Sequence, residues 1–73
     1  MANLQNLTTA EQRIGDLLQQ GLSNKAIAQH LVISIRTVES HISRALAKTG
    51  TTSRLQLVMF LLREAEKRPN LQP

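Results

Sequence analysis

Apolar residues recur every three or four positions along most of the chain, as they do in helices that bury one face. No stretch of the sequence shows the strict alternation that indicates a half-buried strand. Short polar or glycine-containing segments separate four such apolar stretches. The pattern predicts an all-α fold with helices over about 9–20, 24–31 and 34–48, and a fourth helix that begins near residue 54.

A hydroxyl side chain stands just before each predicted helix, where it can accept a hydrogen bond from a free amide of the first turn. Thr8 is followed three residues later by Glu11, which is the spacing of a capping box. The other predicted caps are Ser23, Ser34 and Ser53, the last with Gln56 at the capping-box position. Gly21 can turn the chain out of the first helix, so start and stop signals both support this division.

Helical spacing also identifies a candidate core, which must be aliphatic because Phe60 is the only aromatic residue. At 73 residues the chain has room for one domain. The predicted inward residues of the first three helices are Ala10, Ile14, Leu17, Leu18, Ile27, Ala28, Leu31, Ile35, Val38, Ile42, Ala45 and Leu46.

The fourth helix has more apolar residues than one buried face needs, with seven in the eight positions 55–62. An inward stripe can be formed by Leu55, Val58, Met59 and Leu62. The surplus is then Leu57, Phe60 and Leu61, which we expect on the surface. Because exposed apolar groups usually mark contacts, these three residues predict a dimer interface. A docking surface for another domain, or completion of the core, are the alternatives.

The second and third predicted helices are joined by only a few residues, as in a helix-turn-helix motif. Ala28 is small enough to let the two helices cross closely. Apart from its inward stripe, the third helix is polar, and short side chains at Ser40 and Ser43 would let it approach base edges in a major groove. The motif therefore predicts binding to double-stranded DNA.

The charge distribution favours the same function. The chain carries a net charge of +4, and its cations gather in the middle. Between residues 24 and 54 a single acid, Glu39, stands against Lys25, Arg36, Arg44, Lys48 and Arg54. Such a basic region is typical of a face that binds a polyanion, although an ordinary solvated basic surface is the alternative.

Several classes of function are excluded or disfavoured. Without cysteine the chain forms neither disulfides nor thiolate zinc sites, and it has no glycine-rich phosphate loop or metal-binding histidine motif. We therefore expect no enzyme activity, no cofactor and no metal. No apolar run approaches the ~20 residues of a membrane span, so we expect a cytoplasmic protein. We expect a flexible arm over 1–6, one domain over 7–67 and a disordered tail over 68–73.

A family resemblance rests on the same residues. The matching segments are Leu7-Thr8-Thr9-Ala10-Glu11, Gly21-Leu22-Ser23-Asn24-Lys25-Ala26-Ile27-Ala28, Leu31, Ile33-Ser34, Thr37-Val38, His41, Lys48 and Ser53-Arg54. Over about residues 7–62 the chain resembles the LuxR-type (GerE- or FixJ-type) helix-turn-helix domain of bacterial transcription regulators. It departs from that pattern at Thr49 and Thr51, where the family usually has aliphatic residues, so we expect a looser corner before the fourth helix.

The resemblance implies a three-helix core plus a fourth C-terminal helix, with the third helix in the major groove and a homodimer formed through the fourth. By position it implies base contacts from Glu39, Ser40 and Ser43. The implied phosphate contacts are Lys25, Ser34, Arg36, Thr37, Arg44, Lys48 and Arg54. RNA polymerase is a further candidate partner. Most members also carry a regulatory domain before this one, so a stand-alone regulator and a fragment of a two-domain regulator both stay open.

Two alternative functions also stay open. The chain can be the promoter-binding region of a sigma factor, which would act as a monomer with polymerase. It can be a protein-interaction module that keeps the fold without binding DNA. Within the motif, His41 lies at the edge of the buried stripe, and we expect it to pack there rather than contact a phosphate.

Overall fold

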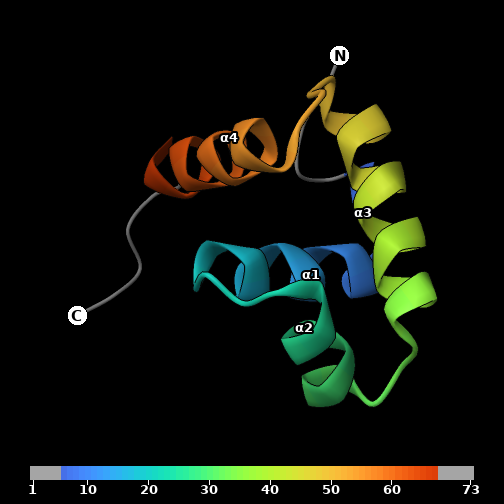
Figure 1. Cartoon of the computed structure of the whole chain (residues 1–73). Coiled ribbons are helices and arrows are strands. Elements are labelled where there is room, and N and C mark those ends of the chain that lie inside the picture. Colours follow the sequence, from blue (N-terminus) through green and yellow to red (C-terminus); the bar gives the residue numbers. More distant parts are fainter. Residues whose placement is uncertain (1–5, 68–73) are drawn as a thin grey trace.

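The computed structural model describes residues 6–67, and these residues form four helices and no strand (Figure 1). The helices are α1 (Thr9–Gln19), α2 (Asn24–Leu31), α3 (Ile35–Thr49) and α4 (Arg54–Lys67). The predicted all-α class and the four helices are confirmed. The tail predicted over 68–73, and the arm predicted over 1–6 except its last residue, lie outside the described residues.

Each helix begins where its cap was predicted. In the capping box, the Glu11 amide donates to Thr8 Oγ1 over 3.1 Å and the Thr8 amide donates to Glu11 Oε1 over 2.9 Å. The hydroxyls of Ser23, Ser34 and Ser53 accept from the amides of Ala26, Thr37 and Gln56 over 3.1, 3.0 and 3.1 Å. The carboxamide of Gln56 does not complete the predicted box, because it accepts from the amide of Thr52 instead.

In Figure 1, α3 runs along one side of the molecule, while α4 and α2 lie on either side of α1. Both α1 and α3 contact every other helix, so these two helices together form the centre of the packing. The core is aliphatic, as predicted, and its most deeply buried side chains include Ile14, Ile27, Val38 and Leu57, one from each helix. Since burial of each such side chain stabilises a fold by about 1.5–3 kcal/mol, these four helices hold one another in place.

The predicted division of α4 into two faces is wrong. Leu57 and Leu61 are only 0% and 4% exposed, and Phe60 is half-buried against the core. The exposed apolar side chains are instead Leu55 (67%), Met59 (54%) and Leu62 (46%). Both triplets have helical spacing, so spacing alone does not choose between them.

Gly15 of α1 explains why Leu61 faces inward. A β-carbon added to Gly15 would lie 2.8 Å from Leu61 Cδ1, so the glycine leaves the space that this leucine fills. Leu57 lies one turn earlier on the same face of α4 and enters the core beside it. The close approach of α1 and α4 at a glycine thus selects the buried face of α4.

Two further predicted core residues are exposed. Ala10 and Ile35 lie in the first turns of α1 and α3, and Ile35 is 43% exposed. The buried side chains of α3, such as Val38 and Ile42, begin one turn later. The first turn of each helix is thus less covered by its neighbours than the rest of its inner face.

The corner between α2 and α3 has a left-handed residue at its first position. Val32 has φ 58° and ψ 50°, and its side chain is 88% exposed. This conformation costs a residue with a β-carbon roughly 1–2 kcal/mol, because the β-carbon approaches the next carbonyl oxygen. The amides of Val32 and Ile33 both donate to the Ala28 carbonyl, which fixes the tight exit from α2.

The corner between α3 and α4 is held by hydrogen bonds at the two residues that depart from the family pattern. The buried Thr49 hydroxyl donates to the Ala45 carbonyl over 2.8 Å and lies 2.9 Å from Thr51 Oγ1. Gly50, with φ 71°, ends α3 between them. Hydrogen bonds therefore hold this corner, whereas the absence of the usual aliphatic residues at Thr49 and Thr51 had predicted a looser one.

Candidate nucleic-acid interface

The third helix has two faces of opposite character. Val38, Ile42 and Ala45 are buried against the other helices. The three predicted base contacts, Glu39, Ser40 and Ser43, are all exposed. Exposed side chains on the same helix also include Arg36 and Arg44. One side of α3 therefore anchors it to the domain, and the other offers hydrogen-bonding groups and positive charge to solvent.

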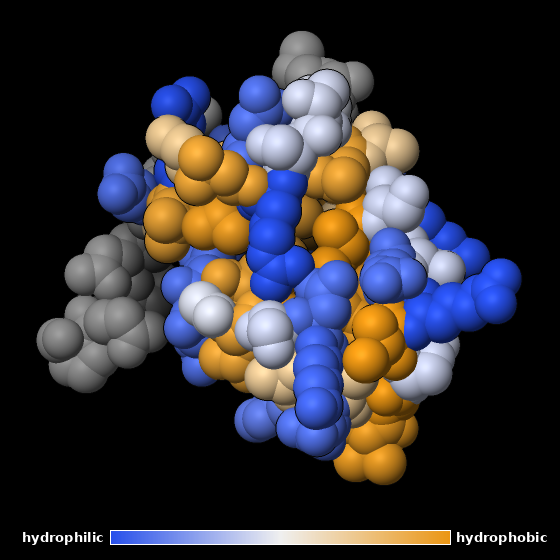
Figure 2. Space-filling view, in the orientation of Figure 1, coloured by the Kyte–Doolittle hydropathy of each residue, from blue (hydrophilic) through white to orange (hydrophobic). Residues whose placement is uncertain are grey.

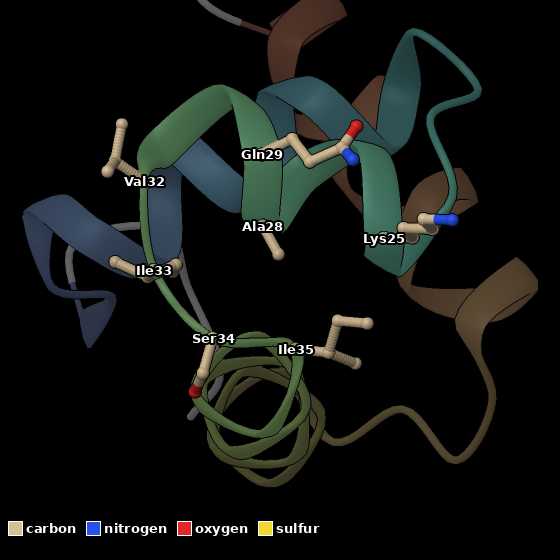
Figure 3. Close-up of a pocket in the computed structure, with 7 residues that line it drawn as sticks. All are labelled: Lys25, Ala28, Gln29, Val32, Ile33, Ser34 and Ile35. Atoms are coloured by element: carbon tan, nitrogen blue, oxygen red, sulfur yellow. The ribbon is translucent and has the colours of Figure 1, made fainter.

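A groove lies between α2 and α3, at the corner that joins them (Figure 3). Lys25 lies at its edge on α2, and Ser34 lies at the start of α3. The Ser34 hydroxyl caps α3 and lies 2.9 Å from the hydroxyl of Thr37, and both residues are exposed. Because the free amides of a helix N-terminus attract anions, this end of α3 can accept a phosphate beside Lys25.

Lys48, a predicted phosphate contact, forms an ion pair within the domain. Its Nζ lies 2.8 Å from Oε1 of Glu11, and the Glu11 side chain is almost fully buried. Burial raises the pKa of Glu11, but the hydrogen bonds from Lys48 and from the Thr8 amide outweigh this effect and hold its pKa below the ordinary value of 4.5. The charge of Lys48 is thus already matched, which leaves little of it for a phosphate.

Arg54, another predicted phosphate contact, links α4 to the segment before α2. Its guanidinium donates to Asn24 Oδ1 over 2.5 Å and to the Leu22 carbonyl over 2.6 Å. Arg54 remains exposed, and a guanidinium has five N–H donors, so these two bonds leave others free. Its first role in the structure is to position the start of α2 relative to α4.

His41 is half-buried, in line with the packing role predicted for it. Its Nδ1 is buried and has no hydrogen-bond partner among the described residues. The same ring lines a shallow depression together with Arg13 and His30, at the side of α3 that faces α1. Leu31 and Ile33 also line this depression, so it lies where α1, the end of α2 and α3 meet.

Polar and apolar side chains divide the surface into separate regions. Figure 2 shows apolar groups over α4 and, apart from them, at the corner between α2 and α3. The exposed large apolar side chains are Leu55, Met59 and Leu62 on α4, and Val32 and Ile35 at the corner between α2 and α3. Sequence analysis had identified neither, because it placed Leu55, Met59, Leu62 and Ile35 in the core and treated Val32 as part of a tight corner.

The short corner between α2 and α3, and the exposed polar face of the second of these helices, define a helix-turn-helix domain. The chain belongs to the family described as bacterial regulatory proteins, luxR family, whose model matches residues 5–61. The predicted family is therefore confirmed, and with it the general function of this unit, a DNA-binding domain of a transcriptional regulator.

Individual relatives agree with this assignment. The chain is 51% identical over 57 residues to the response regulator Rre1 of Synechocystis, covering 78% of this chain and 25% of the relative. It is 45% identical over 60 residues to the spore germination protein GerE of Bacillus subtilis, covering 82% of this chain and 81% of the relative. The chain thus spans only about a quarter of the length of Rre1 but most of GerE.

A solved structure shows the same fold. The structure of the transcription factor GerE superposes with a TM-score of 0.75 at 42% identity, covering 82% of this chain and 90% of that one. The relatives described here are regulators rather than enzymes, which supports the prediction of a non-enzymatic function. Within residues 6–67, no helix is both long and apolar enough to cross a membrane.

Proposed function

We propose that this domain binds specific sequences of double-stranded DNA in the cytoplasm to regulate transcription, with α3 in the major groove and two copies joined through α4. The observation that carries the proposal is the division of α3 into a buried apolar face and an exposed polar one. A helix held in this way offers its polar face to a partner while its apolar face stays packed in the domain. That is what a recognition helix requires to enter the groove.

The exposed face of α3 supplies the proposed base contacts. Ser40 and Ser43 are short, so they let the helix backbone approach the bases, and each hydroxyl can both donate and accept a hydrogen bond. Glu39 can accept a hydrogen bond from the amino group of cytosine. These three residues therefore account for sequence preference in the proposal.

The cations and hydroxyls around this face supply the proposed phosphate contacts. Because their side chains are exposed, we assign the main phosphate contacts to the three cations and two hydroxyls Lys25, Arg36, Arg44, Ser34 and Thr37. Lys48 is removed from the main set because it is paired with Glu11, and Arg54 contributes through the donors that its internal bonds leave free. Phosphate contacts fix the position of a protein on the duplex, whereas base contacts specify the sequence.

The proposed homodimer uses the exposed face of α4, in place of the face first predicted. Leu55, Met59 and Leu62 are spaced at intervals of four and three residues, so they form one apolar stripe along the helix. A stripe of this kind packs well against its own copy about a two-fold axis. Two domains related in this way would read two half-sites of an inverted repeat.

Selection of bound duplexes from a random pool at moderate salt tests the proposal. We expect one enriched motif with two related half-sites. Affinity for the enriched duplex should fall steeply as salt rises, because bound cations are released from the DNA. Replacing Arg44 with alanine should lower the slope of that dependence by about one, whereas the matched change Arg63→Ala on α4 should leave it unchanged. Folded protein that enriches no sequence would overturn the proposal.

A further inference from the structure

Ile35, the first residue of α3, occupies an unusual place for an isoleucine. Its side chain is 43% exposed and lies in the groove between α2 and α3, where Figure 3 shows it directed towards α2. Ala28 forms the apolar wall opposite, and Lys25 lies at the rim. An apolar side chain is thus kept half open to solvent beside a cation, on the edge of the proposed DNA interface.

The surroundings of Ile35 show which kind of partner fits it. Lys25 on α2 and Arg36, the residue after Ile35, are exposed cations. The hydroxyl of Ser34 caps the start of α3 by accepting from the Thr37 amide. A polyanion would be attracted to these groups, and an uncharged apolar partner would have to approach past them. The occupant suggested by charge complementarity is therefore the DNA that α3 is proposed to read.

The position of Ile35 on the helix narrows the contact further. In helix-turn-helix proteins, the N-terminal residues of the second helix reach the base edges. Every base edge in the major groove carries polar groups, but thymine alone adds a methyl group to them. An isoleucine at this place has no group that can donate or accept a hydrogen bond, so the thymine methyl is the feature that it can recognise.

We infer that Ile35 reads the 5-methyl group of a thymine, once in each half-site, in addition to the hydrogen-bonding residues Glu39, Ser40 and Ser43. This inference rests on the proposed DNA binding through α3. It assigns to the groove between α2 and α3 a role in sequence preference, with Lys25 and Ser34 placing the strand and Ile35 contacting the base.

The test uses the enriched duplex, in which each thymine is replaced in turn by deoxyuridine, which lacks only the methyl group. For the wild-type protein, we expect one position in each half-site where this change weakens binding about fourfold, as expected for removing one methyl group from an apolar contact. In Ile35→Ala the effect at that position should disappear. The control Val32→Asn changes another exposed apolar residue at the groove, whose side chain is directed away from Ile35 in Figure 3, and it should retain the full effect.

Each result decides the question. If wild-type protein binds the duplex specifically but no deoxyuridine weakens binding, or if Ile35→Ala retains the effect, this inference fails while the proposed function stands. If no duplex is enriched, both fail together. Circular dichroism checks that Ile35→Ala is folded. If it is not, the polar variant Ile35→Gln replaces it, and loss of the deoxyuridine effect at the same position is then the expected result.

Discussion

Lys48 near the end of α3 donates a 2.8 Å hydrogen bond to Glu11 in the first turn of α1, 37 residues earlier in the chain. The same carboxylate oxygen accepts from the Thr8 amide, so one buried atom joins the cap of α1 to the far end of α3. A buried carboxylate without partners would be strongly unfavourable. This contact therefore helps to hold the C-terminal end of α3 against the start of α1.

The two partners should respond differently to removal. Lys48→Ala leaves Glu11 buried without its cation, whereas Glu11→Ala leaves a lysine that is already 34% exposed and can turn to solvent. We expect Lys48→Ala to lower the free energy of unfolding by about 1–3 kcal/mol, the usual cost of an unsatisfied buried group. Thermal or urea unfolding measures it. Arg63→Ala, an exposed change, should cost less than about 0.5 kcal/mol, and an equal loss there would contradict this account.

Glu11 should also make stability depend on pH in acid. Its pKa in the folded protein lies below 4.5, because the hydrogen bonds from Lys48 and Thr8 outweigh the opposing effect of burial. A carboxyl with a lowered pKa binds a proton more weakly when folded, so its contribution is complete above the unfolded pKa and is lost as the pH falls through the folded pKa. Unfolding of wild type and Glu11→Gln from pH 7 to pH 3 checks this. The gap between the two curves should narrow in acid, and a constant gap would argue against an ionised Glu11.

Changes to the two faces of α4 should separate folding from assembly. Replacing Leu55, Met59 and Leu62 together with serine should leave a folded domain that is monomeric in analytical ultracentrifugation, because all three side chains are exposed. The matched change on the other face, Leu57→Ala, should cost about 2–5 kcal/mol of stability, because it empties a fully buried site. A triple variant that still dimerises would place the interface elsewhere.

Val32 offers a stabilising change. Its left-handed backbone is strained for a β-branched residue, and its exposed side chain makes little packing that would be lost. Because asparagine tolerates this conformation better, we expect Val32→Asn to raise the free energy of unfolding by about 1 kcal/mol. Chemical denaturation provides the measurement. Unchanged or reduced stability would mean that Val32 is not strained in solution.

Much of the fold could be predicted because its signals are local. The caps at Thr8, Ser23 and Ser34 determine where helices begin, and a hydroxyl followed by free amides is visible in a short stretch of sequence. The buried face of α3 was largely predicted too, because only one stripe of its residues is apolar. The exception was Ile35, which lies in the open groove between α2 and α3 and is only partly covered there.

The parts that could not be predicted depend on contacts between distant residues. On α4, two apolar triplets have equivalent spacing, and the space beside Gly15 decides which one is buried. Among the predicted phosphate contacts, Lys48 and Arg54 have long side chains that reach partners 37 and 30 residues away in the sequence. Charge and position along the chain predicted that both would be cationic surface groups, but the internal partners appear only in the folded structure.

The central claim is that α3 reads bases, and repeating the duplex selection with a change on its exposed face tests it most directly. Glu39→Ala removes a side chain that is exposed and is not part of the hydrophobic core. If α3 lies in the major groove, the variant should enrich a motif that differs from the wild-type motif at one base pair in each half-site, with the rest unchanged. Identical motifs for the wild type and for Glu39→Ala, Ser40→Ala and Ser43→Ala would contradict the claim that this face of α3 specifies the sequence.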